Sequence, residues 1–196
     1  MNIKSLLSII IMEYKLNCGN KSVVYNLLYP NYCYKYLFYL RIYEYAISNK
    51  HNPCLYLLRV ILKFKINKWS QKAKIEFPTF TIGHGCRINH TVGGIIVNSR
   101  ARVGKNAYIS NGVIIGQSSI YEPYSVPMIG NNVHLAPNCK IFGRITIGDN
   151  VIIGTDCIVR YSVPSNSCVV GNPAKIVRLN GNKCNIILSE YDSTIG

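Results

Sequence analysis

Acidic residues are scarce in this chain of 196 residues. Eight Asp and Glu stand against 22 Lys and Arg, which gives a formal net charge of +14. The imbalance is greatest in residues 1–74, which contain 12 basic residues and only 2 glutamates. Such an excess suits an anionic partner, namely a membrane surface, an acidic glycan, a phosphorylated cofactor or nucleic acid, and equally suits a plain solvated basic surface.

Several patterns are absent, and each absence removes a class of protein. No helix-turn-helix, zinc-knuckle or RNP-like pattern supports nucleic-acid binding. The eight cysteines form no CxxC pair and no cluster with metal-ligand spacing, so we predict neither a metal site nor a disulfide framework. Free cysteines favour a reducing cytoplasm, so we expect a cytoplasmic protein, with contact at the inner membrane surface as an option.

Long hydrophobic runs are missing too. The N-terminal stretch "MNIKSLLSIIIMEYKL" contains an apolar run that is too short to span a bilayer, and no small-residue cleavage site follows it. We expect a helix there. Apolar residues at helical spacing predict that all of residues 1–74 are helical, with Pro30 and Pro53 marking helix boundaries. Ten of the 15 tyrosines fall in this half, where packing explains most of them and a membrane-facing role is the alternative.

From Phe77 onward the chain has a period of six. Aliphatic residues recur at Ile82, Ile88, Val97, Val103, Ile109, Ile115, Ile129, Leu135, Ile141, Ile147, Ile153 and Val159. A small or β-branched residue stands four places after each of most of these, and a glycine directly follows six of them. This hexapeptide repeat predicts a parallel β-helix, in which each step is one short strand and a turn.

The predicted fold class is therefore α+β. Residues 1–74 form a helical domain, residues 75–178 a β-helix, and residues 179–196 a C-terminal tail. Cys86, Cys139 and Cys157 occupy the small positions, so we expect buried apolar side chains and not nucleophiles.

Two interruptions break the period. The interval from Ile88 to Val97 is nine residues, and the extra residues follow His90. The interval from Ile115 to Ile129 is fourteen, which we interpret as two full repeats with two additional residues. Loops that leave a solenoid are where such scaffolds usually carry function.

Three segments carry a family resemblance: "IGHGCRINHTVGGIIVNSRARVGKNAYISNGVIIGQ", "IGNNVHLAPNCKIFGRITIGDNVIIGTDCIV" and "VPSNSCVVGNPAKIVR". They resemble the hexapeptide-repeat acyltransferases, and are most similar to the serine acetyltransferase branch and its relatives from surface-polysaccharide gene clusters. The resemblance covers roughly residues 60–178. It implies a left-handed β-helix, a homotrimer with acetyl-CoA in grooves between subunits, and direct transfer of acetyl to a hydroxyl.

His90 matches the catalytic histidine of that family. The chemistry agrees, because a hydroxyl needs a positioned base to attack a thioester, and such a base contributes about 10²–10⁴-fold. Serine-specific members have an aspartate directly before this histidine, where this chain has Asn89. An amide can orient the imidazole but cannot balance its charge, so either Glu76 or Glu122 would supply the carboxylate.

The resemblance also suggests how acetyl-CoA is held. Gly116, Ala136 and Thr155 align with positions that offer backbone amides to the pantetheine arm. Lys175 and Arg178 in "GNPAKIVR" would meet the CoA phosphates, for which a basic cap of the solenoid is the plain alternative. A further basic residue of the family is displaced here to Arg160.

For the acceptor we weigh three classes of protein. Ile75 and Val126 stand where serine-specific enzymes have acidic and histidine side chains, so we expect a sugar hydroxyl of a capsular or other surface polysaccharide, anionic or lipid-linked. The long loop offers Gln117, Tyr121, Glu122 and Tyr124 to such a substrate. The alternative is a serine O-acetyltransferase of cysteine biosynthesis. A non-enzymatic or metal-dependent β-helix, such as a γ-class carbonic anhydrase, is disfavoured. The histidines lack the spacing of that zinc site, and an inactive scaffold would not need the insertion after His90.

Overall fold

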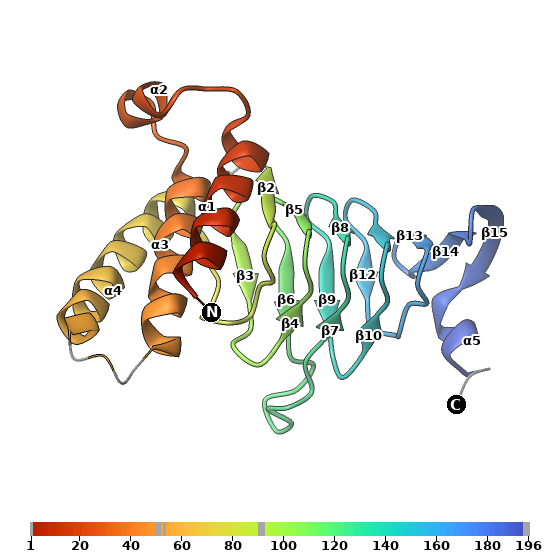
Figure 1. The fold of residues 1–196 in the computed structure, drawn as a ribbon. Helices are drawn as coiled ribbons and strands as arrows, with labels where there is room; N and C mark the ends of the chain where they lie inside the picture. Colours follow the sequence, from red (N-terminus) through yellow and green to blue (C-terminus); the bar gives the residue numbers. More distant parts are fainter. Residues whose placement is uncertain (1, 50–51, 53, 90–92, 194–196) are drawn as a thin grey trace. The chain divides into compact units, whose positions relative to one another are not determined.

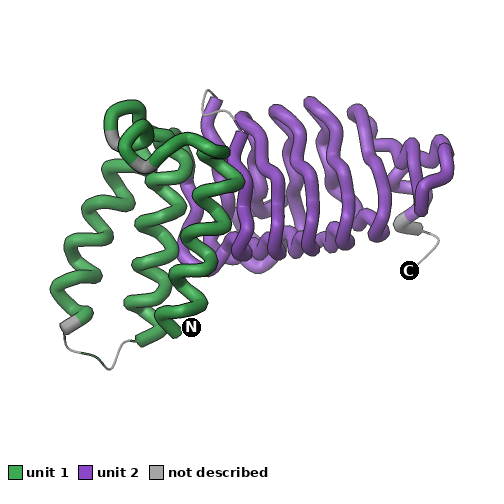
Figure 2. Tube along the Cα trace, turned by 45° about the horizontal axis from the view of Figure 1, so that its top comes forward, with its two compact units in different colours: residues 1–75 green, residues 76–196 purple. Residues whose placement is uncertain are grey.

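The computed structural model describes residues 2–49, 52, 54–89 and 93–193 of the chain. It divides into two compact units, residues 1–75 and residues 76–196, shown in separate colours in Figure 2. The first unit is helical, as the sequence predicts, with α1 (Ile3–Cys18), α2 (Val23–Leu28), α3 (Tyr32–Ser48) and α4 (Cys54–Ala73). Among the described residues, no helix combines the length and apolar character needed to traverse a bilayer.

The helices begin where their sequences provide caps. The side chains of Asn2, Ser22 and Asn31 accept hydrogen bonds from the backbone N–H three residues further on, and these residues precede α1, α2 and α3. Helix α3 packs against both α1 and α4, and its side chains Tyr36, Leu37 and Leu40 are almost fully buried. Helix α3 is therefore the core element of this unit.

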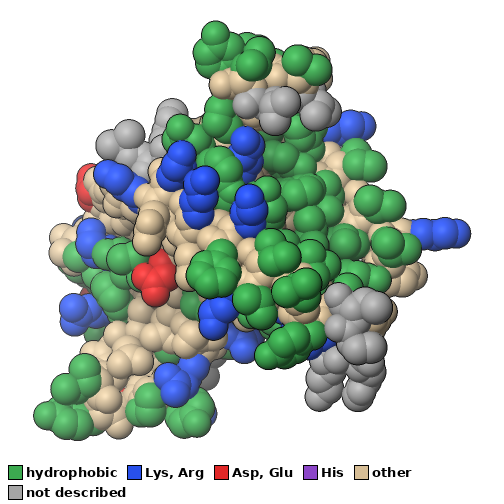
Figure 3. All heavy atoms as spheres, turned by 90° about the vertical axis from the view of Figure 1, so that its left-hand side faces the viewer, with side chains coloured by type: hydrophobic (Ala, Val, Ile, Leu, Met, Phe, Trp, Pro, Cys, Tyr) green, Lys and Arg blue, Asp and Glu red, His purple; other side chains and the backbone are tan. Residues whose placement is uncertain are grey.

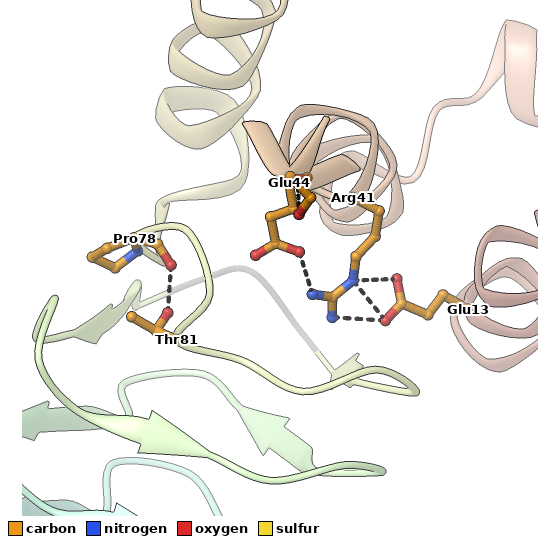
Figure 4. A network of polar contacts seen from close by, with 6 residues as sticks. Glu13, Arg41, Glu44, Pro78 and Thr81 are labelled. Carbon is orange, nitrogen blue, oxygen red and sulfur yellow. Dashed lines mark hydrogen bonds and ion pairs between the residues drawn. The ribbon is translucent and has the colours of Figure 1, made fainter. Parts of the chain in front are cut away.

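A buried charge network lies in the same unit (Figure 4). The Arg41 guanidinium donates to both carboxylate oxygens of Glu13, with Nη2 to Oε1 at 2.9 Å, and to Glu44 Oε2 from Nη1 at 3.0 Å. All three side chains are nearly inaccessible to water. Burial by itself lowers the pKa of Arg41, but the two carboxylates outweigh it and raise that pKa above its ordinary value. Arg41 therefore stays charged.

The second unit is built from three sheets that the chain visits in rotation, and the strands of the repeat are parallel (Figure 1). Sheet A contains β1 (Ile75–Glu76), β3 (Ile95–Val97), β6 (Ile114–Gly116), β9 (Lys140–Phe142) and β12 (Ile158–Val159). Sheet B contains β4 (Arg102–Val103), β7 (Met128–Ile129) and β10 (Thr146–Ile147). Sheet C contains β2 (Arg87–Asn89), β5 (Tyr108–Ser110), β8 (His134–Leu135), β11 (Ile152–Ile153), β13 (Ser167–Val170), β14 (Lys175–Leu179) and β15 (Asn182–Ile187).

The six-residue period fills the interior of this solenoid. Each of the twelve aliphatic residues of the repeat is buried. They stack in register on each face, as Ile109 does with Leu135 and Ile115 with Ile141. The three cysteines at the small positions, Cys86, Cys139 and Cys157, have no exposed surface, which confirms the prediction that they are core residues. Burial raises the thiol pKa of Cys139 to about 12 and that of Cys157 to about 11, so both stay protonated.

The corners depend on residues that tolerate unusual backbone geometry. At the ends of the sheet B strands, a Cβ added to Gly104 would lie 2.5 Å from the carbonyl oxygen of Gly130 in the next coil. The same corner, between sheets B and C, contains four asparagines with φ between 55° and 57°: Asn106, Asn132, Asn150 and Asn166. Their side chains form a ladder in which each Nδ2 donates to the Oδ1 of the next, over 2.9 to 3.1 Å. We call these four residues the asparagine ladder.

We expect Asn132→Ala to destabilise the solenoid by about 1–2 kcal/mol, because alanine is strained at a positive φ of 55° and breaks the ladder on both sides. Asn132→Gly removes the same hydrogen bonds but accepts the backbone geometry. Its denaturant midpoint should therefore lie between those of the alanine variant and the original chain. Equal losses of stability in the two variants would contradict the view that backbone strain at residue 132 destabilises the alanine variant.

The two interruptions of the repeat lie at corners. Ile88 belongs to sheet C and Val97 to the next face, sheet A, so nine residues replace six at one corner. Ile115 belongs to sheet A and Ile129 to sheet B, also adjacent faces. Our interpretation of the fourteen-residue interval as two repeats was wrong. The chain takes one step, and most of residues 117–127 form a loop, which projects from the sheets in Figure 1.

The segment that we expected to be a C-terminal tail contains regular structure. Strand β14 runs antiparallel to β13, and β15 runs antiparallel to β14. Helix α5 (Leu188–Ser193) follows, with Leu188 fully buried and its N–H donating to the carbonyl of Ala174. Sequence periodicity missed these elements because they leave the six-residue repeat.

Candidate functional site

A hollow of about 620 Å³ lies where the strands of sheet A end. The parallel register sets Gly116 beside Phe142, and Ile141 beside Val159, so the residues that follow β6, β9 and β12 meet at one corner. The lining residues are Gln117, Ser118, Phe142, Gly143, Arg144, Ile145, Arg160 and Tyr161. They combine two guanidinium groups, two aromatic rings and a backbone with small residues, which suits an anionic ligand with a flat or extended part.

A second hollow, of about 440 Å³, lies over the earlier strands of the same sheet. It is lined by Glu76, Pro78, Ile96, Val97, Asn98, Ser99, Ile114, Ile115, Gly116 and Gln117. Gln117 lines both hollows, and its Oε1 accepts a hydrogen bond of 3.4 Å from Asn98 Nδ2. Sheet A thus brings together three residues that the sequence assigns to the site, Glu76, Gly116 and Gln117, with Arg160 at the far end.

Gly116 is required by its neighbour. A Cβ at this position would lie 3.0 Å from the ring of Phe142, which occupies the next coil at the same register. The glycine therefore lets the aromatic ring lie against the backbone at the edge of the hollow. Sequence reasoning missed both Phe142 and Arg144, although the place of Phe142 directly after the core residue Ile141 was a signal that it reaches this corner.

The other predicted cofactor residues lie at different places. Asn89 pairs with Ser110, and Leu135 with Ile153, so Asn89, Ala136 and Thr155 belong to the corner where the sheet C strands end. That corner is distinct from the corner of Gly116 and Arg160. Lys175 and Arg178 lie on β14, beyond the last parallel strand. A single chain therefore does not gather all six predicted cofactor residues into one hollow.

His90, the predicted general base, lies outside the described residues. Its neighbour Asn89 ends β2 in sheet C. On the other side of the insertion, the carbonyl of Gly94 accepts a hydrogen bond of 2.6 Å from the N–H of Gly112. Asn89 and Gly94 therefore both lie at the sheet C corner, the corner that also contains Ala136 and Thr155.

The predicted substrate loop contributes less to the hollows than we expected. Tyr121 and Tyr124 are 88% and 77% exposed, and neither they nor Glu122 line either of these two hollows. The base of the loop is closed by a hydrogen bond of 2.7 Å between the hydroxyls of Ser118 and Ser125. Of the four residues assigned to the acceptor, only Gln117 lines the site.

The remaining described histidines belong to the scaffold. His134 stacks edge-on against Tyr108, with ring centroids 4.4 Å apart, and burial lowers the pKa of its imidazole. Among the described residues, no three His, Cys, Asp or Glu side chains are grouped as metal ligands would be.

The sequence of this chain is similar to that of known proteins. No family model matches the chain. A serine acetyltransferase of Staphylococcus xylosus is 39% identical over 106 residues, which cover 54% of this chain and 49% of that protein. The chain spans about half the length of the curated relatives it matches.

Solved structures show the same fold. The soybean serine acetyltransferase apoenzyme superposes with a TM-score of 0.72 at 21% identity, over 89% of this chain and 69% of that one. The serine acetyltransferase of Neisseria gonorrhoeae superposes with a TM-score of 0.70 at 23% identity, over 93% and 69%.

These likenesses confirm the family that the motifs indicate. Both in sequence and in fold, the chain is similar to serine acetyltransferases, which are hexapeptide-repeat acyltransferases.

Our expectation of a polysaccharide acceptor was therefore wrong, since the relatives and the structural neighbours are serine acetyltransferases. The structure shows where the argument failed. Ile75 and Val126 are 1% and 8% exposed, so these core side chains carry no information about the acceptor. Three of the four loop residues assigned to a sugar also lie away from the hollows.

Proposed function

We propose that this protein is an acetyl-CoA-dependent O-acetyltransferase whose acceptor is the hydroxyl of L-serine. The observation that supports it best is the 39% identity to a serine acetyltransferase over 106 residues. Two structural neighbours are serine acetyltransferases, one complexed with serine and one with CoA. The two adjoining hollows on sheet A give this chain room for a coenzyme and a small acceptor.

The proposal includes a left-handed coil and a homotrimer. The predicted coenzyme residues lie at two separate corners, Gly116 with Arg160 at one and Ala136 with Thr155 at the other. In a trimer, the first corner of one subunit can face the second corner of its neighbour, so both sets contact one acetyl-CoA. The site then needs two subunits.

The larger hollow suits the coenzyme. Arg144 and Arg160 provide charge-assisted hydrogen bonds for phosphate groups, and the corner residues Gly116 and Gly143 allow close approach of an extended arm. Lys175 and Arg178, on β14, stay predicted partners of the coenzyme phosphates. In the smaller hollow, the exposed carboxylate of Glu76 is placed to pair with the ammonium group of serine.

The transfer itself needs one base. His90 accepts the hydroxyl proton of serine while the serine oxygen forms a bond to the acetyl carbonyl carbon. When the tetrahedral intermediate collapses, the carbon–sulfur bond breaks, and the proton passes from the imidazole to the departing thiolate. The products are O-acetylserine and the free thiol of CoA. Asn89, directly before His90, orients the imidazole.

We expect saturable release of thiol from acetyl-CoA with L-serine, and none above background with D-serine, because pairing of both charged groups fixes the hand of the acceptor. A thiol-trapping assay on the purified chain measures this, with the O-acetylated product identified by mass spectrometry. Absence of product with L-serine would refute the proposed function. Equal rates for both enantiomers would refute the two-charge mode of binding.

A further inference from the structure

The exposed charge of the helical unit is of one sign. Residues 1–75 contain only two acidic residues, Glu13 and Glu44. Both carboxylates are buried against Arg41, at 1% and 4% exposure. The exposed Lys residues that the structure describes in this unit therefore have no acidic side chain of the same unit on the surface with them. A surface of this kind attracts anions over its whole extent.

Helix α4 exposes an apolar stripe on this basic background. The stripe consists of Tyr56, Leu57, Val60, Ile61 and Phe64. Tyr56, Val60 and Phe64 follow one another at intervals of four, as do Leu57 and Ile61, so all five share one face of the helix. Leu57 and Phe64 are 67% and 72% exposed, although residues of this type are normally buried. The opposite face contains the buried Leu62.

Lysines border the stripe. Lys63 lies at one edge and Lys65 at the other, while Lys68 continues the line of the stripe beyond its C-terminal end, and all three are exposed. Figure 3 looks onto the side of the molecule where α4 lies, and shows basic and apolar side chains intermingled with few acidic ones. A helix with an apolar face between lysines is the pattern of a segment that lies in a membrane interface, where its charged ends reach the headgroups.

We propose that the α4 stripe and its bordering lysines dock this protein on the surface of an anionic phospholipid bilayer. The apolar side chains enter the boundary between headgroups and acyl chains, while the lysines pair with lipid phosphates. The helix lies on the membrane and does not cross it. The proposal is independent of the acceptor, because it concerns the helical unit alone.

Two observations favour a bilayer over other anionic partners. Nucleic acid would use the lysines but would leave five apolar side chains in water. A second copy of this chain would bring the lysines of two equally basic surfaces together, which is unfavourable.

Helix α1 also exposes apolar residues, at Ile3, Leu7 and Ile11, but it carries only Lys4 and Lys15, so its surface is less suited to anionic lipid.

The test is co-sedimentation of the full chain with vesicles. We expect binding to vesicles containing phosphatidylglycerol and phosphatidylcholine, weakening with salt, and little binding to vesicles of phosphatidylcholine alone. Lys63→Gln with Lys65→Gln should weaken binding about fivefold for each charge removed. Leu57→Ser with Phe64→Ser should weaken it at least as much, with circular dichroism confirming that the helices remain folded.

Matched variants distinguish this surface from others. Lys105→Gln with Lys183→Gln removes two exposed charges from the second unit and should leave vesicle binding unchanged. Leu7→Ser with Ile11→Ser makes the same kind of change in α1 and should also leave it unchanged.

Four outcomes would overturn the proposal. The first is no binding to anionic vesicles, and the second is loss of binding only with the α1 variant. The third is binding to duplex DNA or heparin as tight as to vesicles and insensitive to Leu57→Ser with Phe64→Ser. The fourth is a change in the molar mass of the Leu57→Ser with Phe64→Ser variant, measured by light scattering against the original chain. It would show that the stripe joins copies of the chain. Thiol release with L-serine in the absence of vesicles should be unaffected, so failure here is separable from failure of the proposed function.

Discussion

His90→Ala should lower turnover with L-serine at least a hundredfold and leave the KM for acetyl-CoA nearly unchanged. The hydroxyl of serine is far too weak an acid to lose its proton to water at neutral pH, so removing the base acts on the transition state and not on coenzyme binding. His134→Ala provides the matched control. It removes another imidazole of the solenoid, one that packs against Tyr108, and should retain most of the activity. Near-normal turnover of His90→Ala would refute the assignment.

A mixing experiment extends this prediction to the shared site. Arg160→Ala should be impaired mainly in its use of acetyl-CoA, because it loses a guanidinium in the larger hollow. If His90 and Arg160 of one site come from different subunits, co-refolding the two variants gives some sites with both residues intact. Recovered activity is then expected in the mixture. If both residues act within one subunit, the mixture stays as inactive as its components.

Arg41→Met should destabilise the helical unit by about 3–5 kcal/mol, since it leaves the carboxylates of Glu13 and Glu44 buried without a counter-charge. Chemical denaturation followed by helical circular dichroism measures the loss. Combining Arg41→Met with Glu13→Leu and Glu44→Leu removes all three charges and should restore much of the stability. A single variant as stable as the original chain would show that the network contributes nothing to folding.

The repeat made the fold predictable and the site only partly so. The core positions can be predicted directly from the sequence, because an aliphatic residue recurs every six residues and each is buried in the same way. All twelve of these residues are buried in the structure. The order of the faces is harder to read. The interval of fourteen residues from Ile115 to Ile129 is near twice six, so a long loop at one corner resembled two repeats. Only the register of neighbouring strands resolves that ambiguity.

The site depends on that same register. Glu76 and Arg160 are far apart in sequence and line two separate hollows, which Gln117 joins because the strands of sheet A stack, and no local pattern reveals this. Arg144 escaped notice for the same reason. Ile75 and Val126 are buried, and alignment with a family motif says nothing about whether a side chain faces a ligand or the core.

The antiparallel strands at the C-terminal end have a consequence for solubility. A parallel solenoid has an unpaired strand at each end, and such an edge can accept another chain and grow into a fibre. Here the chain reverses after Val170, so the last parallel strand β13 is paired by β14 and β14 by β15. The new edge has the opposite direction and carries the exposed side chains of Asn182 and Lys183. In sheet C, a second solenoid therefore finds a reversed strand that begins with polar side chains, which disfavours growth of this sheet from the C-terminal end.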